Sequence, residues 1–188
     1  MKVIVLVDLQ NDFVSGALGS PEAQAIIPNV CERVIKIAQE SSEAPLVLYT
    51  KDTHYENYLD TQEGKNLPVP HCIYGTPGWS INKAVSSTID YSSELFRFYS
   101  SGDIINSRIL KTTFGSTDLI KVLKLVNAEE IIFMGLCTDV CLVSNCLAAK
   151  MTLPEVPITV YSDCCAGVTP AKHEAALETM RSCQINVI

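Results

Sequence analysis

Residues 131–141 have the sequence IIFMGLCTDVC, which places Cys141 shortly after a buried-strand pattern, at the point where a helix is expected to begin. Two other apolar runs lead into a charged residue in the same way, one into Asp8 and one into Lys111. Parallel strands gather their carboxyl ends at one edge of a sheet, and ligands bind beyond that edge. The sequence therefore predicts that a thiol, a carboxylate and an ammonium meet there.

Short β-type runs alternate with helical patterns along the chain. Helices are expected between the runs, and one of them begins at Pro170, because Thr169 is a typical N-cap and proline favours the first helical position. Near-continuous apolar strands joined by helices indicate an α/β fold, a doubly wound and mostly parallel sheet of about six strands with helices on both faces. The expected strands cover residues 3–7, 46–49, 104–110, 131–134, 158–161 and 185–188.

Length and composition favour one ordinary globular domain spanning residues 1–188. The net charge of -7 and the scattered Lys and Arg residues argue against nucleic acid or an anionic membrane as a partner. No apolar run approaches the roughly 20 residues that span a bilayer, and no signal-peptide pattern opens the chain, so we expect a cytoplasmic protein. The eight cysteines lie mainly in apolar or motif positions and are interpreted as reduced thiols.

The thiol of Cys141 has the features of a nucleophile. A free thiol has a pKa near 8.5, so forming the thiolate at pH 7 costs about 2 kcal/mol unless its surroundings lower that pKa. We expect Lys111 and the start of a helix to lower it, and Asp8 to take the thiol proton and return it to a leaving amine. Each residue alone is explained as well by a packed core thiol or a charged strand end, and the convergence of all three favours catalysis.

A second group of side chains fits a metal site. Asp52 and His54, two apart in an extended segment, point to the same side, and His71 can reach them from a loop that also carries Glu63. A mixed imidazole and carboxylate site with open positions suits a divalent metal, Zn first, with Fe, Mn or Co as alternatives. For Asp52 and His54 alone, a hydrogen-bonded strand end explains the pattern as well as a ligand pair does. The irregular stretch 52–79 is expected to be a binding loop.

Several motifs of the chain resemble those of the isochorismatase-like cysteine hydrolases and, within them, the nicotinamidases. The resemblance implies a catalytic triad of Asp8, Lys111 and Cys141. It also implies a cis peptide bond between Leu136 and Cys137, which turns the backbone N–H groups of Cys137 and Cys141 into an oxyanion hole. The matching pieces are residues 7–13 (VDLQNDF), Lys111, residues 135–141 (GLCTDVC), Asp52 with His54, and Pro70 with His71.

The same resemblance implies hydrolysis of a small carboxamide, nicotinamide above all, to the acid and ammonia through a thioester on Cys141. It implies that the predicted metal ligands hold a metal that binds a ring nitrogen of the substrate, and that the protein is a homo-oligomer. Phe13 and Trp79 are interpreted as aromatic walls for a flat heteroaromatic amide, although aromatic residues are as often part of a core.

Two departures from the nicotinamidase pattern leave the substrate open. Only two threonines separate Lys111 from Phe114, where many nicotinamidases have a longer stretch, so one wall of the pocket must differ. Cys137 stands where alanine is common and places a second thiol beside the nucleophile, with disulfide formation as one consequence. A hydrolase of another small amide or carbamoyl compound is the nearest alternative. A non-enzymatic binding or redox-sensing protein that uses its thiols as a switch is another.

Overall fold

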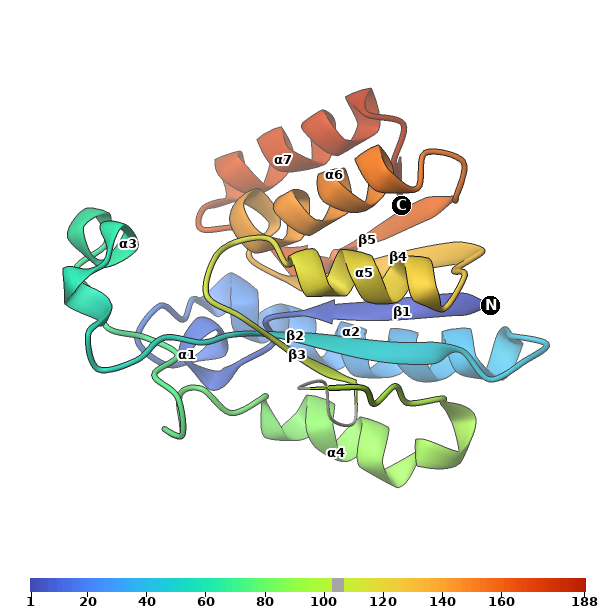
Figure 1. The fold of residues 1–188 in the computed structure, drawn as a ribbon, viewed down its shortest axis with the longest axis horizontal. Coiled ribbons are helices and arrows are strands. Elements are labelled where there is room, and N and C mark those ends of the chain that lie inside the picture. The colour runs from blue at the N-terminus through green and yellow to red at the C-terminus, as the bar shows by residue number, and fades with distance from the viewer. Residues whose placement is uncertain (103–106) are drawn as a thin grey trace.

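The computed structural model of the chain describes residues 1–102 and 107–188, and at its centre lies a six-stranded sheet whose neighbouring strands are all parallel. The strand order is β3-β2-β1-β4-β5-β6, so the chain starts in the middle of the sheet and winds outward in both directions (Figure 1). The expected α/β fold with a parallel sheet is confirmed. The strands are β1 (Lys2–Val7), β2 (Leu46–Asp52), β3 (Arg108–Lys111), β4 (Glu130–Leu136), β5 (Ile158–Ala166) and β6 (Asn186–Val187).

All six strands differ in extent from the expected ranges; β2 continues to Asp52 and β4 to Leu136, and the largest differences concern β3 and β5. The strand expected at residues 104–110 begins at Arg108, and the part of that expectation at residues 104–106 lies outside the described residues. Strand β5 includes Cys164 and Cys165, which the apolar pattern places after the strand. It is longer because pairing with β4 resumes beyond an irregularity in the register.

Helices cover both faces of the sheet, with α2 and α4 on one face and α5, α6 and α7 on the other (Figure 1). None of the helices in the described ranges is long and apolar enough to cross a membrane. The helices are α1 (Asn11–Val14), α2 (Pro21–Glu40), α3 (Gln62–Asn66), α4 (Lys83–Tyr91), α5 (Thr117–Leu125), α6 (Val143–Thr152) and α7 (Pro170–Ser182), with shorter helical turns η1 (Tyr58–Asp60), η2 (Ser93–Leu95) and η3 (Thr138–Leu142).

Strand β1 is buried on both faces, which explains why its sequence contains a continuous apolar run. Its three valines belong to the core under α5, α6 and α7, whereas Ile4 and Leu6 belong to the core under α2 and α4. Fully burying an apolar side chain of this size stabilises the fold by about 1.5–3 kcal/mol. Both faces therefore hold β1 in register, and the residue that follows it is fixed at the edge of the sheet.

The helix starts follow N-cap signals in the sequence. The hydroxyl of Thr169 accepts a hydrogen bond from the backbone N–H of Lys172, with Pro170 as the first helical residue of α7. Ser20 caps α2 in the same way, ahead of Pro21. The predicted start of the last helix is confirmed.

The candidate site residues lie near the carboxyl ends of four strands. Asp8 follows β1, Asp52 ends β2 and Lys111 ends β3. Cys141 lies in η3, the π-helical turn that follows β4. Gly135, near the end of β4, has φ of +128°, and the backbone of β1 lies where a Cβ atom would be, so this position favours glycine on both counts.

Candidate active site

Asp8, Lys111 and Cys141 meet in one buried cluster. The Nζ atom of Lys111 lies 2.6 Å from Oδ2 of Asp8 and donates to Sγ of Cys141 at 3.5 Å. Asp8 is fully inaccessible, and Lys111 and Cys141 are 5% and 4% exposed. Oδ2 of Asp8 accepts no hydrogen bond of good geometry from the described residues, so the nearby ammonium is the group that compensates its buried charge.

Thr50 holds the other oxygen of Asp8, and sequence reasoning missed it. Its hydroxyl donates to Oδ1 of Asp8 at 2.7 Å and accepts from the backbone N–H of Asp8 at 3.2 Å. Thr50 lies opposite Val7 in the pairing of β1 with β2, one position before Asp8. Only the strand register reveals this contact, and the register is not readable from either strand alone.

Burial and the facing charges together determine the pKa values of the cluster. It raises the pKa of Asp8 even though Lys111 attracts the ionised form. Burial alone would lower the pKa of Lys111, but the facing charges of Asp8, Cys141 and Asp52 outweigh it and raise that pKa. Lys111 is therefore firmly protonated, while the ionised form of Asp8 is disfavoured.

The pKa of Cys141 is raised, whereas the sequence predicts that Lys111 and a helix start lower it. Desolvation of the buried thiol is the largest cause, and the charge of Asp8 adds to it; the attraction of Lys111 is smaller. The residue lies in the π-helical turn η3, which continues directly into α6, so the expected helix start is present but burial still sets the direction of the shift. Burial therefore favours the protonated form of the Cys141 thiol.

Four side chains form a second cluster beside Asp8, Lys111 and Cys141, and the sequence predicts that these four lie together. The Nε2 atoms of His54 and His71 lie 3.0 and 3.4 Å from Oδ2 of Asp52. The same two atoms lie 3.6 and 3.7 Å from Oε1 of Glu63 on α3. One potential ligand atom from each of the four residues falls within 4.8 Å of the others, and three of the residues are buried.

The donor set of this cluster fits a divalent metal. Two imidazoles and two carboxylates offer nitrogen and oxygen ligands without thiolate, as in sites that keep positions open for water or substrate. Nδ1 of His71 donates to the carbonyl of Val69 at 2.8 Å, which orients the ring and leaves Nε2 facing the cluster. The ring of Tyr58 packs against both imidazoles, with centroid distances of 4.6 Å to His54 and 5.1 Å to His71.

A cavity of about 370 Å³ lies over the sulfur of Cys141 and reaches Asp52, Glu63 and His71 of the second cluster. Phe13, one of the two predicted aromatic walls, lines this cavity, and its contact with a substrate stays a prediction. Trp79, the other, lines a different cavity between β2 and α4. The lining also includes residues that the sequence pattern did not indicate, namely Leu67, Phe114, Val140 and Lys172.

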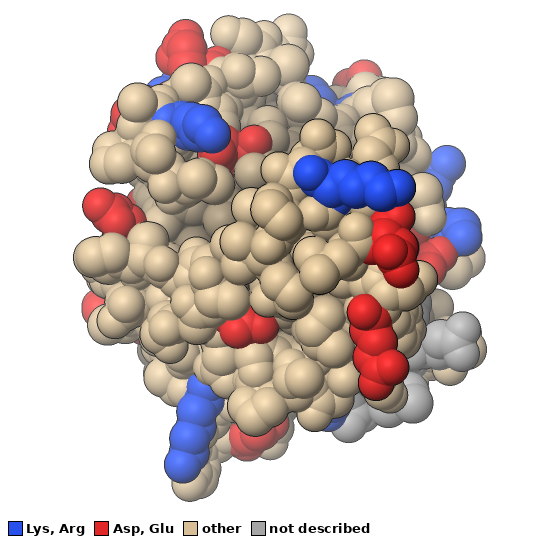
Figure 2. All heavy atoms as spheres, turned by 90° about the vertical axis from the view of Figure 1, so that its left-hand side faces the viewer, with Lys and Arg blue, Asp and Glu red and all other residues tan. Residues whose placement is uncertain are grey.

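The peptide bond between Leu136 and Cys137 is cis, as the resemblance implies. Cys137 and Cys141 both line the cavity of about 370 Å³. All eight cysteines are free thiols. On the face where the strands end, Lys and Arg side chains stand singly among acidic ones (Figure 2).

Comparison with known proteins gives one family. The family model for the Isochorismatase domain matches residues 2–188 of the chain. A nicotinamidase/pyrazinamidase of Mycobacterium tuberculosis is 24% identical over 195 residues, covering 100% of this chain and 98% of that protein.

Solved structures share the fold over almost the full length. The pyrazinamidase of Pyrococcus horikoshii in complex with zinc is 26% identical, with a TM-score of 0.74 and coverage of 100% of this chain and 98% of that one. The N-carbamoylsarcosine amidase of Thermoplasma acidophilum is 22% identical, with a TM-score of 0.72 and coverage of 99% and 94%. This last likeness extends to the fold alone.

Proposed function

The chain belongs to the isochorismatase domain family of hydrolases, and from this premise we propose that it is an amidohydrolase that converts nicotinamide to nicotinate and ammonia through a thioester on Cys141. The observation that carries the proposal is the buried ammonium of Lys111, which contacts both Asp8 and the sulfur of Cys141. Named relatives that act on nicotinamide or pyrazinamide support the substrate class.

In the proposed reaction Asp8 accepts the thiol proton while the sulfur of Cys141 adds to the carboxamide carbon. Burial raises the pKa of both the Cys141 thiol and the Asp8 carboxyl, so the ionised forms of the proton donor and of its acceptor are both disfavoured. Lys111 stays charged and stabilises whichever partner is ionised. Collapse of the adduct passes the proton from Asp8 to the departing ammonia, and water then cleaves the thioester to give the acid and the free thiol.

Backbone N–H groups of Cys137 and Cys141 are the proposed oxyanion hole. Both residues line the cavity, and the peptide bond before Cys137 is cis. A correctly placed donor of this kind lowers the barrier by about 3 kcal/mol.

Asp52, His54, Glu63 and His71 are the proposed ligands of a divalent metal, with zinc first because a zinc-bound relative shares the fold. A metal there would supply a Lewis acid that binds a ring nitrogen of the substrate. The residues of the chain itself provide the wall against the substrate ring, since Phe13 packs edge-on against His71 with centroids 5.4 Å apart.

The proposal is tested by ammonia release from nicotinamide. We expect turnover by the purified protein and none by Cys141→Ala, whereas Cys183→Ala, which removes an exposed thiol, keeps the full rate. Equal rates for the wild type and Cys141→Ala would contradict the proposed nucleophile. A panel of small amides and carbamoyl compounds identifies the preferred substrate.

A hydrolase of a larger amide or carbamoyl compound is the second candidate, favoured by the shape of the site. Leu67, Phe114 and Val140 line both the cavity over Cys141 and a neighbouring cavity of about 740 Å³. The short link between Lys111 and Phe114 therefore borders space that nicotinamide does not fill. Faster turnover of a bulky amide than of nicotinamide would select this alternative.

A further inference from the structure

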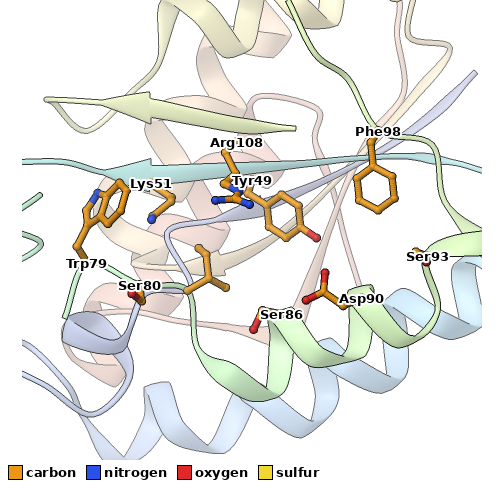
Figure 3. Close-up of a pocket in the computed structure, with 10 residues that line it drawn as sticks. Tyr49, Lys51, Trp79, Ser80, Ser86, Asp90, Ser93, Phe98 and Arg108 are labelled. Atoms are coloured by element: carbon orange, nitrogen blue, oxygen red, sulfur yellow. The ribbon is translucent and has the colours of Figure 1, made fainter. Parts of the chain in front are cut away.

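A cavity of about 560 Å³ between α4 and strands β2 and β3 lies apart from the residues proposed for catalysis. Figure 3 shows Tyr49 and Lys51 entering it from β2, Arg108 from β3, and Asp90 from α4. Successive side chains of a strand point to opposite faces of a sheet. The cavity is therefore on the other face of β2 from Asp52, and its ligands would not compete for space with the amide.

Lys51 is a buried cation without a carboxylate partner in the described part of the chain. The residue is 3% exposed, and its ammonium has no hydrogen bond or ion pair with another described residue. It lies over the ring of Trp79, whose centroid is 2.9 Å from Nζ. A buried charge is costly unless an opposite charge or several hydrogen bonds compensate it. The face of one aromatic ring compensates it less than an anion would.

Arg108 brings a second positive charge to the same end of the cavity. It pairs with Tyr49 in the register of β2 and β3, and Figure 3 shows its guanidinium between Lys51 and Tyr49. Among the described residues no carboxylate forms an ion pair with either cation, and this includes Asp90 across the cavity. Two positive charges that face the same cavity repel each other, and an anion bound between them would offset this repulsion.

We propose that this cavity is a second ligand site, which binds a small organic anion through a carboxylate or phosphate group held between Lys51 and Arg108. A guanidinium and an ammonium together recognise either group by charge-assisted hydrogen bonds. The ring of Trp79 closes that end of the site.

The opposite end of the cavity selects the rest of the ligand. Asp90 and the hydroxyls of Ser86 and Ser93 lie there, on α4 and the turn that follows it. A carboxylate repels a second anionic group and accepts hydrogen bonds from hydroxyl or amino groups. The ligand class is therefore an anion that carries hydroxyl or amino groups at its far end and not a dianion charged at both ends.

Calorimetric titration with glycerol phosphate, glycerate and neutral glycerol tests the proposal and separates phosphate from carboxylate. Trp79 is the only tryptophan of the chain, so its fluorescence reports whether a ligand reaches this cavity. We expect saturable heat and a saturable change in Trp79 emission for at least one of the two anions, and neither signal for glycerol. Absence of binding by both anions, or heat without a change in emission, would overturn the assignment.

Two substitutions locate the site. Lys51→Met keeps the apolar stem of the lysine, and we expect it and Arg108→Gln each to weaken anion binding by about tenfold or more. Arg108 is exposed, so its replacement does not depend on repacking the core. Lys121→Met removes an exposed lysine of α5 and serves as the control that leaves binding unchanged. Undiminished binding by Arg108→Gln would refute the proposal, whatever the fate of the amidase activity.

Discussion

The carboxylate of Asp52 lies 3.3 Å from the ammonium of Lys111 through Oδ1, while its Oδ2 faces His54 and His71. Burial would raise the pKa of Asp52, but hydrogen bonds from the two imidazoles and the charge of Lys111 hold it well below its usual range. Lys111 thus compensates two buried carboxylates, those of Asp8 and Asp52. The cluster of Asp8, Lys111 and Cys141 is therefore coupled electrostatically to the candidate metal ligands through Lys111.

Removing the shared cation should destabilise the protein as well as abolish hydrolysis. Lys111→Met leaves Asp8 and Asp52 buried without their common counter-charge, and breaking a buried pair in this way costs about 3–5 kcal/mol. The free energy of unfolding in urea measures the loss. The matched variant combines Lys111→Met with Asp8→Asn and should regain part of the stability but no activity. Additive losses in the double variant would show that the two residues are not coupled.

Glu63→Gln should weaken metal binding without unfolding the protein. The carboxylate of Glu63 lies farther from the two imidazoles than that of Asp52, and its side chain is 19% exposed. We expect zinc affinity, measured by competition with a chelator, to fall by about tenfold or more. Glu56→Gln is the control, because Glu56 is an exposed carboxylate of the same loop. Equal zinc affinity of the wild type and Glu63→Gln would exclude Glu63 as a ligand.

The proximity of Asp8, Lys111 and Cys141, and that of the candidate metal ligands, could be predicted because the ends of the strands can be recognised in the sequence. An apolar run that stops at a charged or reactive residue puts that residue at the carboxyl edge of a parallel sheet, as Asp8 and Lys111 show. The candidate metal cluster could be predicted because two of the three histidines follow Asp52 in one irregular stretch of sequence that also carries Glu63.

Features that depend on neighbouring strands or on burial could not be predicted from the sequence. Thr50 reaches Asp8 only through the register of β1 and β2. Trp79 follows an irregular segment without periodicity, so nothing in the sequence indicated which face of β2 it covers. The direction of the Cys141 pKa shift depends on desolvation of the buried thiol, whereas the sequence indicated only the charge of Lys111 and the start of a helix.

Gly135→Ala should destabilise the junction between β4 and β1. The new Cβ would collide with the backbone carbonyl of Val7, and φ of +128° is itself unfavourable for alanine. We expect a loss of about 3 kcal/mol in the free energy of unfolding. Gly75→Ala is the matched control: Gly75 has φ of +80° with open space around it, so only the backbone strain of about 1 kcal/mol applies. Similar losses for both would mean that the close approach is unimportant.

His173 should make the protein less stable in mild acid. Burial lowers its pKa from the ordinary 6.5, and its Nδ1 lies 2.8 Å from the hydroxyl of Thr138 at the start of η3. A histidine whose pKa is lowered on folding contributes stability above its unfolded pKa and loses it as the pH falls through the folded value, because the unfolded chain then binds more protons. Urea unfolding of the wild type and His173→Gln at pH values on either side of 6.5 measures this contribution. Parallel pH profiles for the two proteins would exclude it.

Thr50→Val should impair the base without disturbing the fold. The hydroxyl donates to Oδ1 of Asp8, and this hydrogen bond lowers the pKa of the carboxyl. Without this donor the ionised form of Asp8 is less stable, and the pKa of its carboxyl rises further. We therefore expect the acid limb of kcat/KM to move to higher pH and the rate at neutral pH to fall by about tenfold. Thr159→Val, a replacement of the same kind in β5 outside both clusters, is the control and should leave the profile in place. An unshifted acid limb in Thr50→Val, with normal urea unfolding, would mean that Asp8 is not the group whose ionisation limits hydrolysis.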